Sequence, residues 1–244
     1  MTNEKFPQQL NFKILSGSSL KIIAIITMLI DHIGAVVIWH GYLLPNAPIA
    51  PNTLAYNIYT AYKIMRFIGR ISFPIFCFLL VQGFIHTSNK RNYAIRLFLF
   101  ALISEIPFDI AIHGSWWSFA SQNVFFTLLI GFLVLWFINI WQDKTYLHLI
   151  LIALGMGLSF VMKTDYSYWG VILIVALYYF RNWPAMQTIS GSIFLSWEAP
   201  AILAFIPINM YNGKRGMSLK YFFYLFYPVH LAALALIRYL LFNK

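Results

Sequence analysis

The stretch Leu20–Ile38, LKIIAIITMLIDHIGAVVI, sets the class of structure expected for the whole chain. It is an apolar run of membrane-spanning length that begins at Lys21 and carries Asp31 and His32 near its middle. Titratable groups at that depth are costly, so they are usually paired or functional. Positions 21 and 32 are close to three helical turns apart, so both side chains lie on nearly the same face, roughly 16 Å apart along the axis. The stretch therefore predicts a transmembrane helix with a base at mid-depth and a cation at the membrane edge.

The composition of the whole chain agrees with a membrane location. Hydrophobic residues make up 61% of the 244 residues and charged residues only 10%, whereas soluble domains contain about 25% charged residues. The 17 basic residues outnumber the 7 acidic ones, but they gather in short gaps between apolar runs. The positive-inside rule accounts for that pattern without a nucleic-acid partner. Cys77 is the only cysteine, which excludes a disulfide within one chain and a cysteine-based metal site.

The apolar runs predict an all-α polytopic membrane protein, a single domain over residues 1–244 built as a bundle of about 8–9 transmembrane helices. The basic residues that precede the first run place the N-terminus in the cytoplasm. The expected spans are about 20–38, 64–86, 94–112, 123–141, 147–162, 166–180 and 219–242.

Residues 185–211 allow two arrangements. A single helix would carry the basic loop that follows, with Lys214 and Arg215, to the outer side, against the charge rule. Two short or re-entrant segments, broken between Glu198 and Pro200, would return that loop to the cytoplasm. We favour the broken arrangement.

Two pairs of charged residues lie in the second and third spans. Arg66 and Arg70 are four residues apart, so both guanidinium groups project from one helix face. Glu105 and Asp109 have the same spacing and are candidates to pair with the arginines, while Pro107 between them would loosen their helix. Two interpretations remain open. The four groups form a structural ion-pair network, or the planar arginine forks bind a phosphate.

The C-terminal part contributes a basic turn and a second histidine. Glycines flank Lys214 and Arg215, so the backbone can approach an anion closely there, although a cytoplasmic topogenic loop has the same composition. The last span carries Tyr227 and His230, and a lone histidine of this kind is more often a hydrogen-bonded packing group than a catalyst. Since His32 and His230 are remote in sequence, we predict no metal site.

Three functional classes follow from these residues. The first is a membrane-embedded transferase in which His32 acts as general base, because the imidazole pKa lies near operating pH. The second is a proton-coupled transporter in which Asp31, His32, Glu105 and Asp109 form a relay. The third is an assembly factor whose charges only pair helices. No inverted internal repeat, which would favour the transporter, is visible in the sequence.

Four stretches resemble the TraX family, which is named for proteins that N-acetylate F-type pilin subunits. They are LKIIAIITMLIDHIGAV (20–36), the run from MRFIGR to EIPFDIA (65–111), YNGKRG (211–216) and YPVHL (227–231). The family is similar to the larger superfamily of acyltransferase-3 proteins, which modify surface polysaccharides. The resemblance runs in the same order from residue 20 to residue 231.

The resemblance implies roles for individual residues. The relatives share a basic residue, ten intervening residues and a histidine, which Lys21 and His32 match; His32 would be catalytic and Lys21 a donor-side cation. The relatives also carry an Arg-x-x-Arg motif, whereas three residues separate Arg66 from Arg70 here. The residues expected to hold the donor's phosphates are Lys21, Arg66, Arg70, Lys214 and Arg215. Asp31 or a third-span carboxylate would stabilise the imidazolium, with Glu105, Asp109, Tyr227 and His230 in substrate-binding or supporting roles.

The resemblance also implies acetyl-CoA as the acyl donor, loaded from the cytoplasm across the bacterial cytoplasmic membrane. The acceptor would lie at or beyond the outer face, as a pilin N-terminus or a cell-envelope glycan. Residue types alone do not choose between an amine and a hydroxyl acceptor.

Overall fold

The computed structural model describes residues 12–217 and 220–242, and within these ranges the chain is helical and has no β-strand. This confirms the predicted all-α class. With π- and 3₁₀-helices labelled η, the segments are α1 Gly17–His32, η1 Ile33–Leu43, α2 Leu54–Gly69, α3 Ser72–His86, α4 Lys90–Phe108, η2 Asp109–His113, α5 Val124–Ile140, α6 Thr145–Val161, α7 Ser167–Tyr179, α8 Pro184–Phe194, η3 Ser196–Ala204, α9 Phe205–Asn209 and α10 Lys220–Phe242.

Helix α1 carries Lys21, Asp31 and His32, the titratable residues that the sequence singled out. It begins after Ser16, whose hydroxyl accepts a hydrogen bond from the Ser19 N–H, as an N-cap should. At its other end α1 continues directly into the π-helix η1, and His32 is the last α-helical residue. Wider π turns are rare and are found mostly at functional sites. His32 therefore lies where the helix changes its winding.

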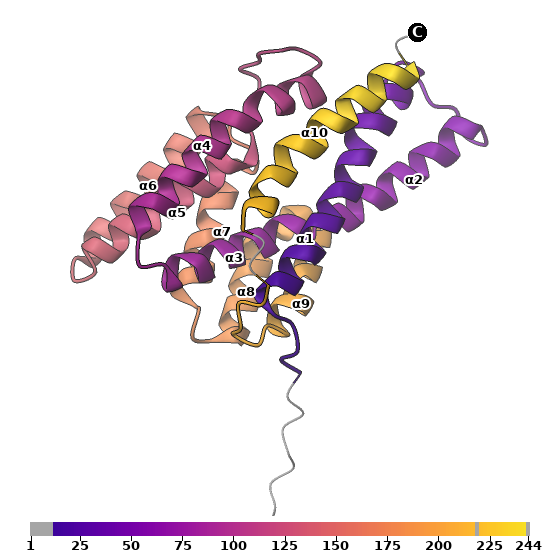
Figure 1. The fold of residues 1–244 in the computed structure, drawn as a ribbon. Helices are drawn as coiled ribbons and strands as arrows, with labels where there is room; N and C mark the ends of the chain where they lie inside the picture. The colour runs from indigo at the N-terminus through magenta and orange to yellow at the C-terminus, as the bar shows by residue number, and fades with distance from the viewer. Residues whose placement is uncertain (1–11, 218–219, 243–244) are drawn as a thin grey trace, which may run out of the picture.

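The helices pack as a bundle (Figure 1). Helix α1 packs against α2 and α3, while α10 packs against η1 and α4. Three segments are long and apolar enough to cross a membrane, namely Gly17–Leu43, Leu54–His86 and Phe222–Phe242. Helices α5, α6 and α7 are apolar but shorter. The protein is thus a helical membrane protein, and the number of its crossings stays a prediction.

The second span begins earlier than its hydropathy predicts. We expected this span to begin near residue 64, but α2 starts at Leu54, after a cap in which the Thr53 hydroxyl accepts a hydrogen bond from the Tyr56 N–H. The residues at the start of α2 are rich in tyrosine and asparagine, so the apolar signal appears only further along the chain. The helix is then interrupted near Arg70 before α3 continues it.

Residues 185–211 are broken, which confirms the favoured arrangement. Helix α8 is followed by the 3₁₀-helix η3, in which Glu198 has non-helical angles of φ −130° and ψ 59°. The chain then returns to the start of α1, where the Leu15 N–H donates to the Met210 carbonyl at 2.9 Å and the Gly17 N–H donates to the Lys214 carbonyl at 2.8 Å. In Figure 1, α8 and α9 accordingly lie beside the beginning of α1. The basic turn is thereby held at the end of α1 that carries Lys21.

Candidate functional site

Two cavities adjoin along α1. The first, about 550 Å³ in volume, includes Lys21, Arg96 and Arg215 in its lining, and we call it the cationic cavity. The second, about 340 Å³, includes Asp31 and His32, and we call it the histidine cavity. Four residues line both cavities, which shows that the two meet: Met28, Phe76, Val124 and Tyr227. Since Met28 precedes His32 by one helical turn, the histidine lies close to this junction.

His32 is hydrogen-bonded to His230 of α10, a residue 198 positions away in the sequence. The distance from His32 Nδ1 to His230 Nε2 is 2.6 Å, and His230 Nδ1 lies 2.7 Å from the carbonyl oxygen of Phe226. A carbonyl only accepts, so the His230 proton is assigned to Nδ1, and in the neutral ring Nε2 is then an acceptor. His32 must therefore donate through Nδ1. Its Nε2 is left as the basic nitrogen of the pair.

Asp31 faces α2 rather than His32. Its carboxylate accepts a short hydrogen bond from Arg66, and this ion pair joins α1 to α2. Gly69 lies directly against Asp31, where a Cβ atom would overlap the carboxyl group. The missing side chain thus allows the close approach of the two helices. The other carboxylate oxygen, Oδ1, is buried and has no hydrogen-bond partner among the described residues.

Arg70 belongs to a second ion pair on the same cavity wall. Its Nε lies 2.8 Å from Glu198 Oε1, and this ion pair joins the interruption between α2 and α3 to η3. The break at Glu198 thus supplies a counter-charge to Arg70. Asp165, on the loop between α6 and α7, also lines the cavity. Burial raises the pKa of Asp165 to about 6, although the positive charge of Arg70 acts in the opposite direction.

The predicted pairing of the α2 arginines with Glu105 and Asp109 is wrong. Glu105 accepts hydrogen bonds from the side chain and the backbone N–H of Asn123, and Asp109 accepts from the Ser118 N–H at 2.8 Å. Both carboxylates thus hold the loop before α5, and neither lines one of the two cavities. Helical spacing correctly placed each pair of charged residues on one face of its own helix. It did not specify which faces of the two helices contact each other.

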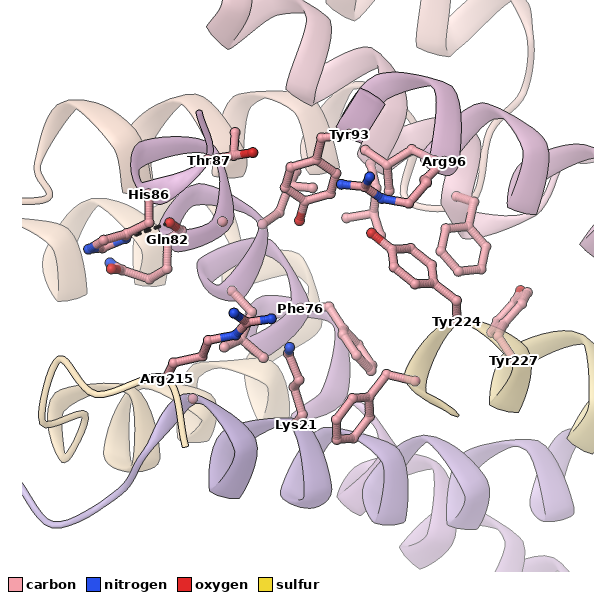
Figure 2. Close-up of a pocket in the computed structure, with 18 of the residues that line it drawn as sticks. Lys21, Phe76, Gln82, His86, Thr87, Tyr93, Arg96, Arg215, Tyr224 and Tyr227 are labelled. Carbon is pink, nitrogen blue, oxygen red and sulfur yellow. Dashed lines mark hydrogen bonds between the residues drawn. The ribbon is translucent and has the colours of Figure 1, made fainter. Parts of the chain in front are cut away.

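The cationic cavity differs from its neighbour in that the described residues lining it include no acidic one. Lys21 projects from α1 and lies over the ring of Phe223, with Nζ 5.0 Å from the ring centre. Figure 2 shows Lys21 and Arg215 near one another and Arg96 across the cavity, beside Tyr93 and Tyr224. Lys214 does not line either cavity.

Arg96 is the functional candidate that the sequence analysis missed. It is an arginine inside the predicted third span, which is the same signal that singled out Arg66 and Arg70.

Among the described residues, no group of three or more His, Cys, Asp or Glu side chains converges in a way that could hold a metal ion. The polar side chains that line the two cavities include cations, histidines, hydroxyls, the Gln82 amide and the carboxylates of Asp31 and Asp165.

These features define a helical membrane protein with a polar centre between its helices. The chain belongs to the TraX family, because the sequence model of the TraX protein matches residues 16–238. It is also 31% identical, over 251 aligned residues, to the probable fimbrial assembly protein FimC, serogroup H1, of Dichelobacter nodosus. That alignment covers 90% of this chain and 94% of the relative. No solved structure matches.

Proposed function

We propose that this protein is a membrane-embedded acetyltransferase that moves an acetyl group from acetyl-CoA to an acceptor on the opposite side of the bacterial cytoplasmic membrane. One observation carries the proposal: the hydrogen bond between half-buried His32 and buried His230 leaves His32 Nε2 as a base close to the junction of two cavities. A base at such a junction can act on an acceptor in one cavity and a donor in the other.

The donor fits the cationic cavity. Acetyl-CoA is polyanionic at its nucleotide end and apolar along its pantetheine arm, and the cavity provides Lys21 and Arg215 together with aromatic and aliphatic walls. The acetyl thioester would then lie against Tyr227, which the two cavities share. With a cytoplasmic N-terminus, the turn at Arg215 and the start of α1 form the cytoplasmic mouth.

The reaction requires one proton to change place. The acceptor nitrogen or oxygen attacks the thioester carbonyl carbon while His32 Nε2 takes its proton, and the C–S bond then breaks. The departing CoA thiolate receives that proton, which restores the neutral histidine. During the step His230 Nε2 accepts the Nδ1–H of His32 and so stabilises the imidazolium and fixes its orientation. Asp31 is held on Arg66 and acts at most through the field of that pair.

The acceptor is a pilus subunit or a cell-envelope glycan. The name of the Dichelobacter nodosus relative, a probable fimbrial assembly protein, supports the pilus subunit. In that case the acceptor group is an amine in its neutral form, since an ammonium ion has no lone pair with which to attack.

The test is CoA release and acceptor acetylation by the purified protein in nanodiscs supplied with labelled acetyl-CoA. We expect His32→Ala to lower the rate by about 10²–10⁴ fold, the usual contribution of a general base. The matched control is His148→Ala. It removes a buried histidine of α6 that bonds Tyr179 and the carbonyl of Trp141 and lines neither cavity. Full activity in a folded His32→Ala protein would refute the proposal.

A non-catalytic assembly factor is the second candidate. It is supported by the relative's name and by the two interhelical ion pairs Arg66–Asp31 and Arg70–Glu198. This alternative predicts pilus assembly that is unaffected by His32→Ala and no release of CoA. The proton relay has less support, since Glu105 and Asp109 bond Asn123 and Ser118 and line neither cavity.

A further inference from the structure

The wall of the cationic cavity opposite Lys21 is built from Arg96, Tyr93 and Tyr224 (Figure 2). The guanidinium group of Arg96 lies over the ring of Tyr93, 5.5 Å from its centre. Tyr93 fits because position 83 is a glycine: a Cβ atom there would lie 2.7 Å from the Tyr93 hydroxyl. The three side chains are therefore packed into place by α3, α4 and α10.

The unsatisfied donor of this group belongs to Arg96. The Nε of Arg96 is buried and has no hydrogen-bond partner among the described residues. A guanidinium group presents only donors, and its planar fork can bind two oxygens of one anion. The hydroxyl groups of Tyr93 and Tyr224 line the same cavity and can rotate to donate to a bound group. The cluster is therefore suited to an anion.

The charge of the cavity supports the same conclusion. Lys21, Arg96 and Arg215 line it together, and no aspartate or glutamate is among the described residues that line it. Three cations around one cavity repel one another, so the cavity is suited to a multiply charged anion that offsets this repulsion. A phosphate monoester carries about 1.5 to 2 negative charges and three strong acceptor oxygens, more than a phosphodiester offers.

We infer that Arg96, Tyr93 and Tyr224 form a binding site for a terminal phosphate monoester. Arg96 donates to two phosphate oxygens, Tyr224 donates its O–H to a third, and Tyr93 orients both groups. In the proposed acetyltransferase this phosphate is the 3′-phosphate of the donor nucleotide. The assignment to the donor nucleotide rests on the proposed function, whereas the phosphate site itself does not. A lipid headgroup such as phosphatidate has the same chemistry.

The experiment measures binding, without turnover, to wild-type and Arg96→Gln protein. In the nucleotide arm the probes are CoA and dephospho-CoA, which lacks the 3′-phosphate. In the lipid arm the protein is placed in nanodiscs that contain phosphatidate or phosphatidylglycerol. We expect wild-type protein to favour the monoester by about tenfold in one arm, and Arg96→Gln to reduce that preference to about onefold. The arm that responds identifies the source.

The controls separate this site from protein damage and from the proposed reaction. Arg181→Gln removes another arginine that is stacked on a tyrosine, in this case Tyr178. Arg181 lines neither cavity. We expect Arg181→Gln to keep the wild-type preference, and Tyr224→Phe to lose part of it. The inference is overturned if Arg96→Gln protein keeps the wild-type preference in both arms, or if the wild type has none. His32→Ala should bind like the wild type, so a failed transfer assay would leave the binding result intact.

Discussion

The two cavities contain the same kinds of cation but differ in what surrounds them. In the histidine cavity Arg66 and Arg70 each meet a carboxylate, from Asp31 and Glu198 respectively. In the cationic cavity the described lining residues include no carboxylate. A cation paired with an acidic side chain contributes to the packing of helices, whereas the Nε of Arg96, which has no hydrogen-bond partner among the described residues, is available to a ligand.

The difference also separates chemistry from binding. The histidine cavity contains His32, whose orientation depends on the neutral His230. The arginines of this cavity are already compensated by carboxylates. Its contents can therefore change protonation during a reaction. The histidine of the cationic cavity, His86, bonds the Gln82 carbonyl of its own helix, whereas His32 is oriented by a histidine of another helix. We expect substitutions in the first cavity to alter stability or turnover, and those in the second to alter affinity.

The largest expected effect is on stability, from Arg66→Gln. This change leaves the buried Asp31 carboxylate without its partner, and loss of one member of a buried pair costs about 3–5 kcal/mol. The measurement is the free energy of unfolding of the protein in detergent, alongside the KM for acetyl-CoA. If Arg66 instead binds the donor, Arg66→Gln should raise the KM and leave the stability unchanged. That result would remove the contrast between the two cavities.

The double variant Asp31→Asn with Arg66→Gln is the control for that experiment. It removes both charges and replaces them by neutral side chains of similar size, so we expect it to recover a large part of the lost stability. If the double variant is no more stable than Arg66→Gln alone, the two residues do not act as an ion pair.

The next effect concerns His230 and separates a positioning role from a packing role. His230→Asn is too short to accept the Nδ1–H of His32, and we expect a fall in kcat of about 10–100 fold, as for other groups that orient a catalytic histidine. His230→Gln can place an oxygen near the original Nε2 and should keep most of the activity. KM and the unfolding temperature should change little in either variant. Equal losses in both would indicate that the ring is needed for packing alone.

Much of the fold could be predicted from the sequence because apolar length and charge placement act locally. The helical class and the break in residues 185–211 follow from those two signals. The start of α2 does not, since its first residues are polar and aromatic and are kept helical by a cap and by packing against α1 and η1. Hydropathy identifies residues suited to the lipid core. It therefore does not detect the part of a helix that extends beyond the apolar run.

The site was predictable only within single helices. The spacing of Lys21 and His32 put them on one helix face, and they line adjoining cavities. The partners come from other helices: His230 is 198 positions from His32, and Arg66 is 35 positions from Asp31. Periodicity gives the direction of a side chain within its own helix but carries no information on how helices rotate against one another. The mistaken pairing of Glu105 and Asp109 with the arginines has this origin.

The smallest effect expected is from Lys21→Gln, and it tests the cationic cavity directly. Lys21 contacts the ring of Phe223, and no acidic side chain is among the described residues of its cavity. Its loss should therefore leave the free energy of unfolding within about 0.5 kcal/mol of the wild type. The affinity for CoA should fall by about 5–10 fold, and its dependence on salt should become less steep, because one charge no longer attracts the anion. The matched control is Lys63→Gln on α2, where a lysine lies over the ring of Tyr59 at 5.1 Å and lines neither cavity. Equal effects of the two substitutions on CoA affinity would mean that the general positive charge of the protein attracts the nucleotide, and the cationic cavity would lose its distinct role.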